Sequence, residues 1–197
     1  GQPVCTLCAE STFKIGHGVG ACDDCPRNSS STASRRTCDC DEGWSGDIVN
    51  ASSRCTECPI NTFKNQKGGM ECTACTANSN TRNVTASINL ASCICDEGYT
   101  GQPASVGGGC VACPFSWYKT DVGPSECTRC PSGTETSILR NETGKKERQM
   151  AATRLTDCVC SEGYYPDKYT ENRISCRPCD VDHYSDTISA LAVEGRA

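Results

Sequence analysis

Two stretches of nearly identical sequence decide the fold: Cys40-Asp-Glu-Gly43-Trp44-Ser-Gly46 and Cys95-Asp-Glu-Gly98-Tyr99-Thr-Gly101. In each, Glu-Gly-aromatic follows the second cysteine of a Cys-x-Cys pair. The glycine allows a turn with positive φ, and the aromatic ring supplies apolar cover in a chain that has little of it. A third copy, Glu162-Gly163-Tyr164, continues Tyr-Pro and lacks the second glycine, so its hairpin is expected to turn differently.

The cysteine spacing around these stretches repeats three times. Thirteen residues separate Cys8 from Cys22, and the same interval recurs twice, from Cys58 to Cys72 and from Cys113 to Cys127. Five residues beyond each leading cysteine stands an aromatic residue, followed by lysine in the first three of the four cases. These aromatics are Phe13, Phe63, Tyr118 and Tyr184. We interpret the repeated aromatics as miniature cores within a repeat architecture.

The composition indicates a disulfide scaffold. The chain has 20 cysteines among 197 residues, but only three Phe, two Trp and two Met to form a core. Ordering each residue costs about 1.5 kcal/mol, which so small an apolar set cannot offset without covalent cross-links. Disulfides on this scale form in oxidising compartments, so the chain is expected to be secreted or on the cell surface.

Further sequence features agree with that compartment. Four sequons predict N-glycosylation at Asn28, Asn50, Asn83 and Asn141. The net charge of −5 gives no reason to expect nucleic acid, and no run of apolar residues is long enough to span a bilayer. No signal peptide stands at the start, and we expect a precursor to carry one.

The motif Cys-x-Cys-x-x-Gly-aromatic-x-Gly resembles the second half of an EGF-like module. The Cys-x-x-Cys-Pro stretches and the aromatic–lysine step resemble the cysteine-rich, EGF-like repeats of ephrin-receptor-type ectodomains and of algal flagellar-hair (mastigoneme) proteins. The resemblance implies a small disulfide-rich fold of tandem EGF-like modules, built from short β-hairpins and loops with almost no helix. It sets module 1 at residues 8–55, module 2 at 58–110 and module 3 at 113–176, with 1–7 ending a preceding module and 177–197 starting a fourth or forming an assembly tail.

The resemblance also implies the disulfide pairing, which spacing alone leaves open because six cysteines allow 15 connectivities. First-to-third, second-to-fourth and fifth-to-sixth pairing would give Cys8–Cys25, Cys22–Cys38, Cys40–Cys55, Cys58–Cys75, Cys72–Cys93, Cys95–Cys110, Cys113–Cys130, Cys127–Cys158 and Cys160–Cys176. Cys5 and Cys179 are left over. They are expected to pair between subunits or with cysteines outside this sequence; a bond between them within one chain would require the rod to fold back.

Linkers of two residues between modules predict a semi-rigid, elongated rod. Residues 131–157 interrupt the pattern, with 27 residues where the equivalent segments hold 12 and 17. We expect this insert, which contains Lys145-Lys-Glu-Arg148, to be a solvated loop, with a partner contact or a processing site as the alternative. Trp117 has no aromatic equivalent in the other modules; core packing is the expectation for it, and a ligand contact the alternative.

We expect no catalytic residues, metal or cofactor. His17 and His183 are the only histidines and lie near no nucleophile motif. Zinc would need reduced Cys-x-x-Cys pairs, against the sequons and the EGF-type motifs. Calcium would need an acidic cluster before each first cysteine, which is missing here.

Two functions remain open from the sequence. The first is a non-enzymatic, glycosylated structural spacer or subunit of an extracellular fibre or surface coat, whose partners are other protein subunits, copies of itself head to tail among them. A head-to-tail contact that does not close on itself makes a filament. The second is a ligand-binding or adhesion segment of a receptor ectodomain.

Overall fold

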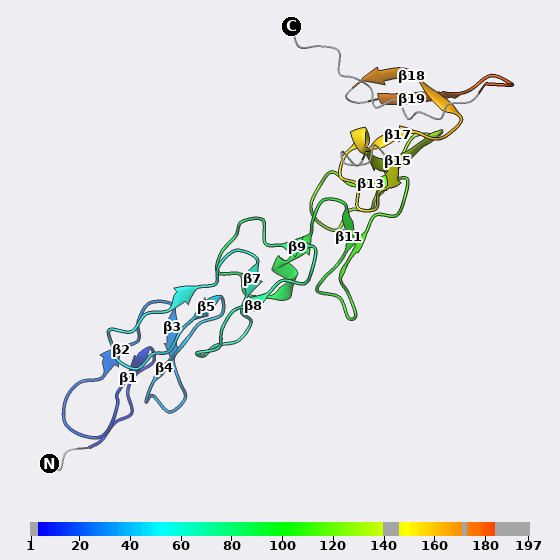
Figure 1. Cartoon of the computed structure of the whole chain (residues 1–197). Coiled ribbons are helices and arrows are strands. Elements are labelled where there is room, and N and C mark those ends of the chain that lie inside the picture. Colours follow the sequence, from blue (N-terminus) through cyan, green and yellow to red (C-terminus); the bar gives the residue numbers. More distant parts are fainter. Residues whose placement is uncertain (1–3, 140–145, 171–172, 184–197) are drawn as a thin grey trace, which may run out of the picture. The chain divides into compact units, whose positions relative to one another are not determined.

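The computed structural model describes residues 4–139, 146–170 and 173–183 (Figure 1). The chain forms two compact units, residues 1–94 and 95–197. The division falls inside the predicted module 58–110, between its fourth and fifth cysteines. The first unit therefore contains predicted module 1 and the first four cysteines of module 2. The second unit contains the last two cysteines of module 2 and all of module 3.

The first unit consists of antiparallel pairs of strands two or three residues long. Its pairs are β1 (Thr12–Phe13) with β2 (Asp23–Asp24), β3 (Ser29–Ser31) with β4 (Cys38–Cys40), β5 (Trp44–Ser45) with β6 (Thr56–Glu57), and β7 (Thr62–Phe63) with β8 (Thr73–Ala74). It also contains β9 (Ser79–Asn80) and the 3-10 helix η1 (Leu90–Ser92), and β10 (Ile94–Cys95) begins at its last residue. Short hairpins with almost no helix are thus the fold, as the sequence predicted.

The second unit repeats this plan and extends it. Its elements are β11 (Tyr99–Gly101), β12 (Cys110–Ala112), β13 (Trp117–Tyr118), β14 (Thr128–Arg129), β15 (Thr134–Leu139), β16 (Lys146–Arg148), η2 (Leu155–Asp157), β17 (Cys158–Cys160), β18 (Tyr164–Thr170) and β19 (Arg173–Pro178). β18 and β19 form a hairpin of seven- and six-residue strands, longer than the corresponding pair β11–β12 (Figure 1).

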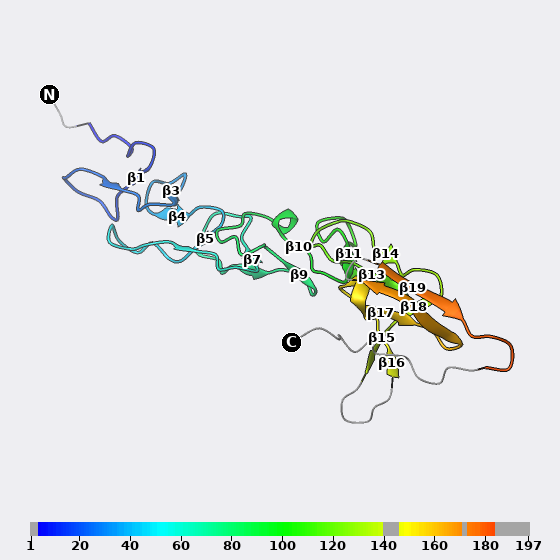
Figure 2. The same ribbon diagram turned by 90° about the horizontal axis from the view of Figure 1, so that it is seen from above.

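The insert at residues 131–157 is not simply a solvated loop. Its β15 lies between β16 and β17 in a three-stranded antiparallel sheet (Figure 2). Thr136, on β15, is fully buried, and its hydroxyl donates to the carbonyl of Gln149 at 2.5 Å. Backbone pairing thus satisfies polar groups that a loop would leave to solvent. Asn141 and Lys145, singled out in the sequence, lie outside the described residues.

The disulfide pairing implied by the resemblance is wrong for two bonds in each set. Among the described residues, nine disulfides join consecutive cysteines: Cys8–Cys22, Cys25–Cys38, Cys40–Cys55, Cys58–Cys72, Cys75–Cys93, Cys95–Cys110, Cys113–Cys127, Cys130–Cys158 and Cys160–Cys176. Their Cα–Cα distances of 5.4–5.9 Å are ordinary for disulfides. The fifth-to-sixth bonds agree with the expectation.

Local turns account for the consecutive pairing. The amide of Thr12 donates to the carbonyl of Ala9 in a tight turn that folds Cys8 back toward Cys22. Cys25 instead lies near β4, because β3 follows it after a short turn and pairs Ser31 with Cys38. Each disulfide therefore closes one local loop, and the same arrangement recurs in the later sets.

Disulfides and a few aromatic rings form the cores. In the first unit, Phe13, Cys38, Cys40 and Ile48 make a buried cluster with Trp44 against it. The second cluster consists of Cys130, Cys158 and Ile174, with Tyr118, Leu155 and Cys176 packed on it. Phe63 is also buried, so the first-loop aromatics are core residues as expected, whereas Tyr184 lies outside the described residues.

Candidate interaction site at the junctions between repeats

The Glu-Gly-aromatic turns adopt the predicted conformation. Gly43, Gly98 and Gly163 have φ of +78°, +76° and +79°. In each turn the amide of the aromatic residue donates to the carbonyl three positions earlier; for Trp44 the acceptor is Asp41, at 3.0 Å. In the first two turns, the N–H and the C=O of the turn glycine both bond to the segment that follows along the chain.

The segment that follows binds both sides of the turn glycine. In the first unit, the amide of Cys58 donates to the carbonyl of Gly43 at 2.8 Å, and the amide of Gly43 donates to the carbonyl of Lys64 at 2.9 Å. A Cβ atom on Gly43 would lie 2.3 Å from the carbonyl oxygen of Ala86. Glycine is therefore required here twice, by the positive φ and by the close approach of the next repeat's backbone.

The same hydrogen bonds and the same close approach to the glycine recur in the second unit. Cys113 donates to Gly98 at 2.8 Å, and Gly98 donates to Lys119 at 2.9 Å. A Cβ on Gly98 would lie 2.3 Å from the carbonyl oxygen of Ala151. We call each set, the turn together with the following residues that bind it, a junction.

A buried lysine secures the first junction. Lys64 directly follows the core aromatic Phe63 and is only 3% exposed. Its Nζ donates to three carbonyls of the preceding Cys-x-Cys hairpin, those of Cys40 at 3.2 Å, Asp41 at 3.3 Å and Trp44 at 2.7 Å. One side chain thus satisfies all the acceptors that converge on it, across two disulfide-closed loops.

Lys119 occupies the equivalent place in the second junction and is 1% exposed. Its Nζ donates to the carbonyls of Asp96 at 3.4 Å and Asp121 at 2.6 Å. The amide of Gly123 adds a bond to the carbonyl of Cys95 at 2.7 Å. The second lysine therefore divides its bonds between the preceding hairpin and its own loop.

Burial changes the protonation energetics of both lysines. Desolvation lowers the pKa of Lys64 from its usual value, and the nearby Asp39, Asp41 and Glu42 offset part of that effect. Desolvation likewise lowers the pKa of Lys119, against the carboxylates of Asp121, Asp96 and Glu97. The pKa of Asp121 is itself lowered, first by the hydrogen bond from the Ser125 hydroxyl. Acidic residues around each turn thus help to keep a buried ammonium charged.

A third junction begins at Gly163. The amide of Cys179 donates to its carbonyl at 2.8 Å, as Cys58 and Cys113 do in the earlier junctions. Asp182 has a φ of +68°, close to the +64° of Asn61 at the equivalent position. The described residues after Cys179 therefore share a backbone turn with the residues that follow Cys58. Unlike Gly43 and Gly98, Gly163 is exposed and would accept a Cβ without contact.

The remaining residues predicted to be functional are spread over the surface. Within the described residues, Cys5 and Cys179 form no disulfide. Asn28, Asn50 and Asn83 are all exposed, as sequons must be to carry glycans. Trp117 is 37% exposed, so the expected core packing is wrong for it: Tyr118 turns into the core, and the preceding residue of a strand faces the opposite side.

The described residues bring no metal-binding group together. They hold no cluster of three or more His, Cys, Asp or Glu side chains placed to share an ion. The eighteen bonded cysteines have no thiolate to offer zinc. His17 and His183 are both exposed. A search of the described part of the chain for helices able to cross a bilayer finds none.

Sequence reasoning missed the role of Lys64 and Lys119. The signal was present, since lysine follows the core aromatic in three repeats at one spacing. A buried ammonium was not inferred because its acceptors are backbone carbonyls, which no side-chain pattern reveals.

Comparison with known proteins identifies the repeats. The family model described as tyrosine-protein kinase ephrin type A/B receptor-like matches residues 46–93 and 97–142. The first window begins after the turn glycine of one hairpin and ends at the fourth cysteine of the next set. The second window begins at residue 97, so the gap between the two windows contains the division between the two compact units.

Individual relatives are long modular proteins. Cysteine repeat modular protein A of Toxoplasma gondii is 33% identical over 77% of this chain and 5% of its own length. Human signal peptide, CUB and EGF-like domain-containing protein 2 is 27% identical over 64% of the chain and 12% of its length. Mouse ephrin type-A receptor 1 is 30% identical over 40% of the chain and 6% of its length. The chain thus spans only a small part of these relatives. Together with the disulfides and the repeated turns, these matches show that the chain consists of tandem cysteine-rich, EGF-like repeats, which resemble those of ephrin-receptor-type ectodomains.

Proposed function

We propose that this chain is a non-enzymatic extracellular spacer that holds consecutive repeats in a fixed orientation within a fibre, a coat or a longer surface protein. The observation that carries the proposal is the junction. A buried lysine, two backbone hydrogen bonds to the turn glycine and a contact that only glycine permits all join one disulfide-closed hairpin to the next loop. So many constraints across a two-residue linker are expected to suppress hinge motion.

The compartment follows from the same chemistry. Disulfide-bonded cysteines make up at least half of the buried residues in each core cluster, so the fold requires an oxidising environment. The exposed positions of Asn28, Asn50 and Asn83 are compatible with N-linked glycans. Relatives whose names contain a receptor or a signal peptide support a secreted or cell-surface location.

Further repeats, on copies of this chain or on a larger protein, are the proposed partners. Consecutive pairing makes the partner of each unbonded cysteine specific. Cys179 corresponds to the first of the six cysteines in a set, as Cys8 does, so consecutive pairing requires it to bond to the second cysteine of a set. Cys5 corresponds to the sixth cysteine, as Cys55 does, and requires the fifth cysteine of a set. A bond between Cys5 and Cys179 of two copies would not reproduce a repeat disulfide, so a second chain would have to join by another pairing.

A receptor-ectodomain segment is the second candidate, and exposed aromatic residues favour it. Phe115 and Trp117 are 46% and 37% exposed in the third repeat. The corresponding positions in the first repeat are Glu10 and Thr12, so the scaffold does not need aromatic side chains there. Trp is enriched among residues that dominate binding energy at protein interfaces.

Two experiments separate these functions. Double electron–electron resonance between spin-labelled non-natural residues at Val19 and Val84, both exposed, would measure the distance distribution across the first junction. A spacer gives one narrow distribution that broadens in Lys64→Ala; a broad distribution in the unmodified chain would contradict the spacer. Cell binding that is abolished by Trp117→Ala, with Lys64→Ala binding normally, would instead support the ectodomain segment.

A further inference from the structure

The two-stranded ladder β13–β14 of the third repeat exposes an aromatic ring next to a cation. Trp117 lies opposite Arg129 in the register of the ladder, and beside them the amide of Cys130 donates to the carbonyl of Ser116 at 2.8 Å. That bond makes Trp117 and Arg129 a non-hydrogen-bonded pair, in which facing side chains lie closest together. Tyr118, the next residue of β13, packs on the core, so the pair shares the outward face of the ladder.

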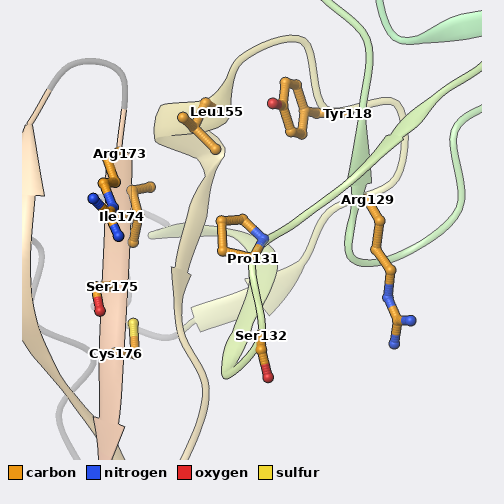
Figure 3. A pocket seen from close by; sticks show the side chains of 9 residues that line it. All are labelled: Tyr118, Arg129, Pro131, Ser132, Leu155, Arg173, Ile174, Ser175 and Cys176. Atoms are coloured by element: carbon orange, nitrogen blue, oxygen red, sulfur yellow. The ribbon is translucent and has the colours of Figure 1, made fainter.

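Both members of this pair are free to meet a partner. Trp117 is 37% exposed, and Arg129 is exposed as well. Figure 3 shows the side chain of Arg129 directed away from Tyr118 and Leu155, which lie on the inner side. Among the described residues, no ion pair or side-chain hydrogen bond occupies the guanidinium of Arg129. The third repeat therefore offers an unpaired cation beside an apolar ring.

The first repeat presents the opposite charge at the equivalent place. In its ladder Thr12 lies opposite Asp24, and Phe13, the next residue of β1, is fully buried, so Thr12 and Asp24 face outward. Asp24 is exposed, and within the described part of the chain its carboxylate has no ion pair or hydrogen bond. The loop that joins β1 to β2 adds two exposed apolar side chains, Ile15 and Val19. This hairpin therefore combines a free carboxylate with apolar surface.

The second repeat indicates that the scaffold requires neither charge. Its ladder pairs Thr62 with Ala74 at the same positions. The residue directly before the third cysteine of each set is thus Asp24, Ala74 and Arg129 in successive repeats, whereas an aromatic residue is kept on the inner side in all three. Folding therefore does not explain the two charges or the tryptophan, but a contact between faces of opposite charge does.

We propose that the outward face of β13–β14 in one copy of this chain binds the β1–β2 hairpin of a second copy. The guanidinium of Arg129 donates to the carboxylate of Asp24, and the ring of Trp117 packs on the apolar side chains of the β1–β2 loop. Because the two patches differ, the contact can repeat from copy to copy, as a fibre or coat requires. The inference rests on the proposed structural function, for which it names a non-covalent contact between copies, and it uses no junction residue.

The test is sedimentation equilibrium of the full chain over a range of concentrations, after alkylation of the free thiols to exclude disulfide-linked dimers. We expect reversible association with a dissociation constant between about 10 μM and 1 mM, because one exposed ion pair and one ring make a small contact. Salt at about 1 M, where charges are screened beyond about 3 Å, should weaken association several-fold. Trp117→Thr introduces the residue that the other two repeats have at this position, and should weaken association about tenfold.

Reversal of the charges identifies the two patches. Arg129→Glu and Asp24→Arg should each weaken self-association by about tenfold or more, because each places like charges opposite one another. A mixture of the two variants should associate as the unmodified chain does, since every contact between unlike copies again joins opposite charges. Arg36→Glu and Glu71→Arg are the matched controls: both residues are exposed, both variants change the net charge equally, and both should associate normally.

A chain that stays monomeric at about 1 mM would overturn the proposal, as would charge-reversal variants that associate normally or a mixture that fails to associate. An unchanged disulfide map shows that each variant is folded. The spacer function fails separately. A monomeric chain with a narrow spin-label distance distribution across the first junction would overturn only this contact, and an associating chain with a broad distribution would overturn only the spacer.

Discussion

Replacing Lys64 with alanine should open the first junction while leaving both adjoining loops folded. The substitution removes three hydrogen bonds from a buried ammonium, at 2.7, 3.2 and 3.3 Å. All three carbonyls would lose the ammonium as a donor, while those of Cys40 and Asp41 keep the amides of Gly68 at 2.9 Å and Trp44 at 3.0 Å. The disulfides on either side remain, so the loss is local.

The free energy that the junction loses in Lys64→Ala follows from two opposing effects. Hydrogen bonds to a charged group contribute about 1.5–3 kcal/mol each, but the lowered pKa of Lys64 shows that burying its charge offsets part of that gain. We therefore expect the junction to lose about 2–3 kcal/mol of stability in total, which is less than the summed contribution of three such hydrogen bonds. That corresponds to an increase of about 30- to 150-fold in the opening equilibrium.

Amide hydrogen exchange measures this opening directly. The amide of Gly43, bonded to the carbonyl of Lys64, should exchange about 30- to 150-fold faster in Lys64→Ala. Lys64→Met, which fills the same volume without donors, should give a smaller increase. Lys14→Ala is the matched control, because Lys14 Nζ donates only to the exposed carbonyls of Gly20 and Ala21 at 3.3 Å. Unchanged exchange at Gly43 in Lys64→Ala would refute the reasoning.

Three further predictions concern the turns, the pH dependence and the covalent structure. Gly43→Ala should destabilise its junction far more than Gly163→Ala, measured by amide exchange, because only the first adds a clash at 2.3 Å to the positive-φ cost of about 1–2 kcal/mol. Because desolvation lowers the pKa of Lys119, the unfolded chain binds more protons than the folded chain between that lowered pKa and 10.5, so the free energy of unfolding should rise with pH across this window. Denaturant unfolding after alkylation of free thiols should show this rise, and Lys119→Met should reduce it. Peptide mapping without reduction should recover Cys8–Cys22, and recovery of Cys8–Cys25 would disprove consecutive pairing.

The sequence predicted the features that repeat as local motifs. The Cys-x-Cys-x-x-Gly-aromatic motif predicted hairpin turns with glycine at positive φ, and Gly43 and Gly98 adopt them. Spacing also located the first-loop aromatics, and Phe13 is fully buried. These features could be predicted from the sequence because one residue type and one local conformation determine each of them.

Features that depend on partners distant in sequence were missed. Consecutive disulfides follow from turns that fold each leading cysteine back, and cysteine counts contain no information about that geometry. The carbonyls that hold Lys64 lie 20–24 residues earlier in the chain. Trp117 was expected to be buried because it adjoins a core residue, but strand alternation exposes it. The insert after Cys130 was expected to be a loop, yet its β15 pairs with β17.

The central claim is that the junction lysines join consecutive repeats into a rigid unit. Residual dipolar couplings of the amides in residues 44–57 and 58–93 test it most directly, because they report the relative orientation of the two segments and its fluctuation. We predict that one alignment tensor fits both segments in the unmodified chain, and that Lys64→Ala reduces the apparent order of one segment relative to the other. Two independent tensors in the unmodified chain would contradict the claim.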